Sequence, residues 1–168
     1  MKMTEMFLQQ LDAEVERSKR ALEQVPEGHF EWQPHPKSMA FGYLVAMVAT
    51  MPSWIAMIVT EDQLDVAPAT PQHKPDPMRS SAELLQGLEK SAAQARKALQ
   101  GTTDDFLNTS WKLLARGQVV HEAKRGVMIR DTFSHLAHHR GQMTVYLRLL
   151  GATVPALFGP SADDKRFA

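Results

Sequence analysis

Two histidines stand four residues apart in the stretch 135–142, which reads His-Leu-Ala-His-His-Arg-Gly-Gln. Each residue of an α-helix advances by about 100°, so His135 and His139 would lie on one face of a helix, one turn apart. Two imidazoles placed in this way can reach one metal ion, and a third ligand from a neighbouring helix would leave a position open for water or substrate. The alternative is that both rings sit at the edge of the core and hydrogen-bond to backbone groups or carboxylates.

The other chemically active side chains are weaker candidates. His138 falls roughly opposite the apolar arc of its helix and is expected in solvent. Arg140 projects into that arc, where an unpaired guanidinium is costly, so we expect a carboxylate or carbonyl partner. His121 precedes Glu122 without a second histidine at helical spacing, which makes a poor site by itself. The remaining histidines lie in proline-rich loops, where solvated or turn-packing roles are expected: His29, His35 and His73.

Composition limits the classes of function. The chain has 168 residues, which indicates one domain spanning 1–168 that is large enough to bury a core without structural metal. Lys plus Arg and Asp plus Glu number 19 each, so no net charge attracts nucleic acid or an anionic membrane. The absence of cysteine excludes disulfides, thiolate metal sites and a cysteine nucleophile, and it favours a cytoplasmic protein.

The spacing of apolar residues predicts the four helices that must position these side chains. We expect them over residues 8–25, 39–60, 80–101 and 127–150, with a kink at Pro52 and a capping box formed by Ser80 and Glu83. Residues 62–77 hold four prolines and are expected to form a loop, whereas 102–126 could be a short hairpin or an irregular crossover. Four long helices without a convincing sheet predict an all-α bundle. Charges throughout 1–25 argue against a signal peptide, and no membrane span is expected.

Two blocks of the sequence resemble a known family. One runs from His135 to Asp164 and contains His-His-Arg-Gly-Gln at 138–142 and Phe-Gly-Pro-Ser-Ala-Asp at 158–163. The other contains His-Pro-Lys-Ser-Met at 35–39 and Met-Pro-Ser-Trp at 51–54. Both are similar to the DinB-like (damage-inducible, YfiT-related) family, in the expected order and over most of the chain.

The resemblance implies a four-helix bundle with a long crossover connection, often a homodimer, that holds a divalent metal by three histidines. His135 and His139 match the pair on the last helix, but Met47 stands where the histidine of the second helix is expected. A thioether is a weak ligand for zinc or nickel in an imidazole site. Three accounts follow: a weakened site that uses His135, His139 and water; a site completed by another residue such as His121 or Glu122; or a bundle that has lost its metal.

The resemblance also implies two functions. The first is a metal-dependent hydrolase or a transferase that uses small thiols, in which Zn, Ni or Mn would activate a bound thiol or water. No catalytic base can be assigned for that function. The second is a metal-free, stress-associated binding or dimerisation module with an apolar pocket under Met47. In both cases we expect a cytoplasmic homodimer, without nucleic-acid or membrane partners.

Overall fold

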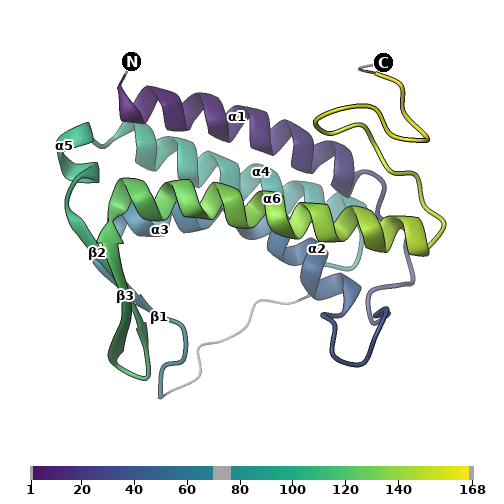
Figure 1. The fold of residues 1–168 in the computed structure, drawn as a ribbon, viewed down its shortest axis with the longest axis horizontal. Coiled ribbons are helices and arrows are strands. Elements are labelled where there is room, and N and C mark those ends of the chain that lie inside the picture. Colours follow the sequence, from purple (N-terminus) through teal and green to yellow (C-terminus); the bar gives the residue numbers. More distant parts are fainter. Residues whose placement is uncertain (1, 70–76, 167–168) are drawn as a thin grey trace.

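Helices that lie side by side dominate the computed structural model, which describes residues 2–69 and 77–166 (Figure 1). All four predicted helical segments are present, and the second is broken in two. The helices are α1 (Met3–Leu22), α2 (Phe41–Thr50), α3 (Pro52–Thr60), α4 (Ser81–Gln100), the short α5 (Asp104–Leu107) and α6 (Arg125–Leu149).

The break between α2 and α3 lies at the predicted kink. Pro52 is the first residue of α3, and the two helices are bent by 51° relative to one another. Proline lacks a backbone N–H and its ring crowds the preceding turn, which explains the break. Within the described ranges no single helix is long and apolar enough to cross a membrane. The bent α2–α3 pair, taken together, is long and apolar enough by length and composition alone.

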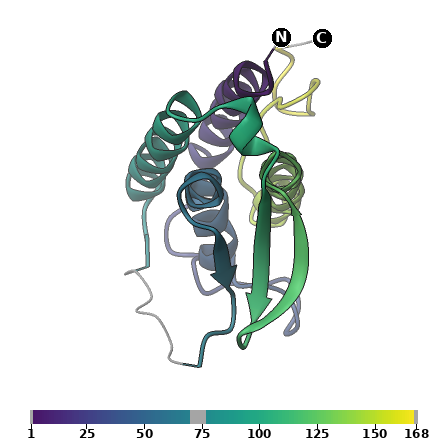
Figure 2. The ribbon, with the colours of Figure 1, turned by 90° about the vertical axis from the view of Figure 1, so that its left-hand side faces the viewer.

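The expected all-α bundle is confirmed only in part, because the fold is mostly helical but includes a small sheet. Its strands are β1 (Gln63–Asp65), β2 (Ser110–Ala115) and β3 (Gln118–Lys124), in the order β1-β2-β3. β2 and β3 form an antiparallel hairpin, as one of the two interpretations of 102–126 proposed, and β1 pairs with β2 in parallel. The sheet extends from the end of the bundle where α3 ends and α6 begins (Figure 2).

The tight turn of the hairpin is anchored to β1. Arg116 and Gly117 both have positive φ, at 53° and 74°, as a two-residue hairpin turn of type I′ requires. The carboxylate of Asp65 accepts the backbone N–H groups of Arg116 and Gly117, at 3.1 and 2.7 Å. With the bond from Ala67 N–H, these contacts lower the pKa of Asp65.

Helix ends are fixed by side chains as well. Ser80 Oγ accepts the N–H of Glu83 at 3.2 Å, which agrees with the predicted start of α4. The first turn of α1 is capped from a distant part of the chain, since the carboxylate of Asp104 accepts the N–H groups of Met3 and Thr4 at 2.7 and 3.0 Å. The crossover, which contains α5, and the N-terminal helix α1 are thereby joined at one end of the bundle.

Candidate metal centre

The structure brings His135 and His139 together on α6. Their Nε2 atoms are 2.8 Å apart and their ring centroids 4.6 Å apart, so the four-residue spacing does place both rings on one side of the helix. The distance is that of a hydrogen bond between one protonated and one unprotonated nitrogen. The two nitrogens therefore converge on a single point beside the helix.

Gln142 fixes the orientation of the His139 ring. The Nδ1 of His139 lies 2.8 Å from Oε1 of Gln142, one turn further along α6. With the amide in this orientation Nδ1 carries the proton and donates it, which leaves a lone pair on Nε2 of His139. His139 is also buried, with 5% of its surface exposed, so its ring is held by packing. This nitrogen is prepared to accept a proton or bind a metal.

His135 is more accessible and packs against Trp54. The ring centroids of His135 and Trp54, which lies on α3, are 5.5 Å apart in an edge-on arrangement. The residue as a whole is exposed, but this contact removes part of the water around its ring. Desolvation, followed by the proximity of His139 and His138, lowers the pKa of His135. A neutral imidazole, the form that binds metals, is therefore favoured.

His138 is exposed, as expected, although its ring centroid lies only 5.0 Å from that of His139. The two residues proposed as replacement ligands lie on β3 and are exposed, and Glu122 accepts a 2.5 Å bond from Ser110 Oγ. Within residues 2–69 and 77–166, no group of three His, Asp, Glu or Cys residues could hold a metal. His121 and Glu122 therefore do not complete the site.

The loop histidines stand apart from this pair. His35 Nδ1 accepts the N–H of Lys37 at 3.1 Å, a local turn contact of the kind expected for it. His29 lies in the same exposed loop, between α1 and α2. His73 falls outside the described residues.

Arg140, next to His139, has the partners that its burial requires. Its guanidinium is 1% exposed and donates to Glu14 Oε2 at 2.5 Å, to Ser18 Oγ at 3.1 Å and to Glu14 O at 3.2 Å. The predicted carboxylate partner thus comes from α1. The other oxygen of Glu14 accepts bonds from Gln10 and Arg17, both at 2.8 Å. This network ties α6 to α1 directly behind the histidine pair.

Sequence reasoning did not find Glu14 or Gln142 as partners. The spacing of both residues could have indicated this role. Glu14 is three residues after the buried Leu11, and Gln142 is three residues after the buried His139. A polar residue in line with a buried stripe is a signal for a buried polar contact.

A scan against protein-family models matches residues 1–166 to the DinB family. The chain belongs to the DinB family. The family match agrees with the resemblance of the two sequence blocks. The structure has a DinB-like fold that is mostly helical and carries a small sheet.

Several DinB-like structures are similar to it. One from Bacillus cereus ATCC 10987 is 24% identical, with a TM-score of 0.71 over 92% of this chain and 97% of the other. YjoA from Bacillus subtilis is 16% identical, with a TM-score of 0.67 over 88% and 94% of the two chains. At these identities the likeness concerns the fold alone. The B. subtilis protein YrdA is 44% identical over 39 residues, a match that spans 23% of each chain.

Met47, which the sequence resemblance places at the first histidine of the DinB pattern, is half-buried on α2. It lines a cavity of about 520 Å³ together with residues of α2 and of the loops 30–31 and 77–79. The described residues that line this cavity include neither His135 nor His139. Met47 as a third ligand of the DinB site stays a prediction.

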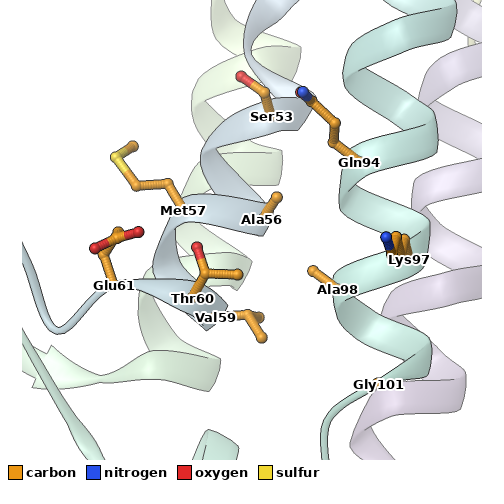
Figure 3. Close-up of a pocket in the computed structure, with 10 residues that line it drawn as sticks. All are labelled: Ser53, Ala56, Met57, Val59, Thr60, Glu61, Gln94, Lys97, Ala98 and Gly101. Carbon is orange, nitrogen blue, oxygen red and sulfur yellow. The ribbon is translucent and has the colours of Figure 1, made fainter.

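A second cleft, of about 610 Å³, lies between α3 and α4 (Figure 3). Gln94 extends from α4 toward the helix that carries Ser53 at one end of it, while Glu61 lies on the α3 side and Lys97 on α4. Its floor is formed by small side chains, among them Ala56 and Ala98. The described residues around it include no histidine, so the cleft is separate from the candidate metal centre.

Proposed function

We propose that this DinB protein binds one divalent metal ion through Nε2 of His135 and Nε2 of His139, with the remaining positions open to water or substrate. The observation that carries the proposal is the 2.8 Å separation of the two nitrogens. Zinc lies about 2.0–2.1 Å from an imidazole nitrogen, so two nitrogens at this separation can bind one ion after a small adjustment.

The second contacts of the two rings support the same proposal. Histidines that bind metals commonly donate their other N–H to an acceptor, which fixes the tautomer, and Gln142 accepts from Nδ1 of His139 in this way. Trp54 restricts the ring of His135 from the other side. Both rings are held close to the orientation that binding requires.

Two imidazoles without a third protein ligand would hold an ion weakly. A thioether adds little for Zn, Ni or Mn, so Met47 does not replace the missing imidazole. We therefore propose affinity well below that of a three-histidine site. Because the protein supplies two ligands, several coordination positions of the ion are left for water or other exogenous ligands.

An ion at this position would act as a Lewis acid and lower the pKa of a bound water or thiol. The reaction class we propose is thus a metal-dependent hydrolysis or a transfer to a small thiol, in a cytoplasmic protein. His135 and His139 bind the ion, Gln142 positions His139, and Arg140 holds α6 against α1.

Metal titration of the protein after treatment with a chelator tests the proposal. We expect saturable binding of Zn²⁺, Ni²⁺ or Mn²⁺ with a stoichiometry near one, measured by calorimetry and elemental analysis, and its loss in the His135→Ala, His139→Ala double variant. His138→Ala is the matched control and should bind as the wild type does. Wild-type protein that binds none of the three ions would refute the proposal, as would undiminished binding by the double variant.

A thiol probe tests the open positions. The Co²⁺-loaded protein should gain a sulfur-to-cobalt charge-transfer band in the near ultraviolet when 2-mercaptoethanol is added. An unchanged spectrum at saturating thiol would reject the thiol-dependent reaction and leave hydrolysis.

A second candidate function is a metal-free binding module. The observation that favours it is the cavity beside Met47, whose lining is mainly apolar. A methionine in place of a ligand histidine packs well without metal. Binding of a small molecule in this cavity, in a protein that takes up no metal, would support this candidate.

A homodimer is part of both candidates. Val145 and Leu149 stand one turn apart on α6 and are 57% and 58% exposed, so they place two large apolar side chains side by side on the surface. We expect sedimentation velocity to give a dimer, and Leu149→Glu to shift it to the monomer. A wild-type protein that sediments as a monomer at high micromolar concentration would reject this part.

A further inference from the structure

We propose that the cavity lined by Met47 binds a neutral, mainly apolar small molecule. The cavity lies between α2, the loop at 30–31 and the segment 77–79 that precedes α4. The inference deepens the binding role of the second candidate function by naming the class of ligand. It does not require the histidine pair to be free of metal, because neither His135 nor His139 is among the described residues that line the cavity.

One wall is held against α2 by a close backbone approach. Phe30 O accepts the N–H of Gly42 at 2.8 Å. A Cβ atom on residue 42 would lie 2.9 Å from that oxygen and 3.1 Å from Phe30 Cβ, closer than such atoms pack. Glycine at 42 is therefore what allows this loop to form a wall.

The opposite wall is held against α4. Met78 packs on Gly87, where a Cβ atom would lie 2.8 Å from the Met78 sulfur. The N–H of Arg79 donates to Glu83 Oε2 at 2.6 Å, which fixes the chain just before the helix. Both walls are held by contacts within the protein, so the cavity is formed before any ligand arrives.

The lining determines the chemistry of the ligand. The volume of about 520 Å³ lies in the range of small-molecule sites, and the thioethers of Met47 and Met78 make favourable contacts with aromatic rings. Two charged side chains line the cavity in the described part of the chain, and both are at its exposed rim. They are Glu31 and Arg79, which pair with each other at 3.2 Å.

A ligand with a net charge would find no counter-charge inside the cavity among the residues that the structure describes, and an unpaired charge is costly to bury. The hydroxyl of Thr50 already donates to Ala46 O at 2.8 Å and can accept one hydrogen bond from the ligand, whereas the hydroxyl of the exposed Tyr43 can donate or accept. These features favour a neutral aromatic or branched-alkyl molecule with at most one small polar substituent.

The test uses N-phenyl-1-naphthylamine, a neutral aromatic probe whose fluorescence rises in apolar sites. We expect saturable binding with a micromolar Kd that is unchanged by EDTA. Ala46→Phe, which puts a ring into the cavity, should weaken binding at least tenfold. The matched control Ala56→Phe fills the α3–α4 cleft instead and should leave the Kd within twofold.

Methionine methyl NMR provides a test on the wild-type protein, so that the result does not depend on the folding of a variant. The probe should shift the methyl signals of Met47 and Met78, assigned through Met→Leu variants, and leave that of Met57 in the α3–α4 cleft in place. Shifts at Met57 alone, or no saturable binding, would overturn the proposal. Loss of binding with EDTA would instead assign the probe to the metal centre and also overturn it.

Discussion

At the scale of single residues, the position of one proton decides how the histidine pair can work. If His139 donates through Nδ1 to Gln142, the 2.8 Å contact between the rings requires that His135 donate through its own Nε2. His135 must then move this proton to Nδ1 before its Nε2 can bind an ion. His139 is prepared for binding, whereas His135, the exposed member of the pair, is the one that adjusts.

Removing the Gln142 acceptor should weaken metal binding without abolishing it. Gln142→Leu frees the ring of His139 and its tautomer, and loss of such a contact typically lowers affinity by about 10–100-fold. Gln142→Glu keeps an acceptor and should restore most of the affinity, as measured by calorimetry. Equal affinities for the Leu and Glu variants would mean that Gln142 does not orient the ring.

Introducing the missing imidazole tests the assignment of Met47. Met47→His should raise metal affinity at least tenfold, a gain of about 1.4 kcal/mol, if position 47 can reach the histidine pair. Met78→His, on the far wall of the same cavity, is the control and should give no gain. Equal affinity of the Met47 variant and the wild type would show that residue 47 does not face the pair.

The spacing of residues along α6 could predict part of the candidate metal centre. The convergence of His135 and His139 followed from helix geometry, because a four-residue interval leaves little freedom. The partner of Arg140 could be predicted by type, as a carboxylate or carbonyl. Its identity as Glu14 could not, because it depends on the packing of two helices that are more than 100 residues apart in sequence.

At the scale of elements, Arg125 joins the start of α6 to the end of α3. Its guanidinium is almost fully buried and donates to the carbonyls of Ile58 and Glu61 and, at 2.6 Å, to the carboxylate of Asp62. A cation at the carbonyl end of a helix is favourable. This contact fixes α6 relative to α3, and thereby His135 relative to Trp54.

The helices were predictable because each buries a stripe of apolar residues at regular spacing. Strand β1 was not, since it is three residues long and depends on pairing with β2, whose residue Leu113 lies opposite Leu64. A strand this short has no pattern of its own. Its position depends on the edge that the β2–β3 hairpin supplies.

Breaking the buried contact between α1 and α6 should destabilise the whole fold. Arg140→Met leaves the carboxylate of Glu14 buried without its main cation, which costs about 3 kcal/mol in the free energy of unfolding. Urea denaturation measures this loss, and adding Glu14→Leu should recover most of it. The control Arg130→Met removes an exposed pair with Asp131 on the same helix and should cost less than about 1 kcal/mol.

At the scale of the whole molecule, the segment after α6 folds back toward the C-terminal half of α1 (Figure 1). Phe158, although 69% exposed, lies over the guanidinium of Arg17, with 4.3 Å between Arg17 Cζ and the ring centroid. Two carboxylates hold this segment. Asp163 accepts bonds from Arg148 and from Val154 N–H, and Asp164 accepts from Ala156 N–H.

Acid should loosen this C-terminal segment. The contact with Arg148 lowers the pKa of Asp163, and the N–H of Ala156 lowers that of Asp164, both from the ordinary value of 3.8. The stabilisation is therefore fully present about one pH unit above the ordinary value and is lost as the pH falls through the lowered values. Amide exchange at Val154 and Ala156, corrected for the intrinsic rate, should accelerate below pH 4.

The double variant Asp163→Asn, Asp164→Asn provides the control. Its exchange at these two amides should be fast already at pH 6 and should change little on acidification. Wild-type exchange that does not accelerate at any acidic pH, or that equals that of the double variant at pH 6, would contradict the role of the carboxylates.

The capping of α1 by Asp104 has a consequence for the order in which the chain can mature. The bond from Met3 N–H spans 101 residues, so the first turn of α1 lacks this acceptor until the segment that contains Asp104 has been synthesised. Until then the N–H groups of Met3 and Thr4 depend on water for these two bonds. The start of α1, although it precedes α5 in the sequence, is thus completed only after α5 has formed.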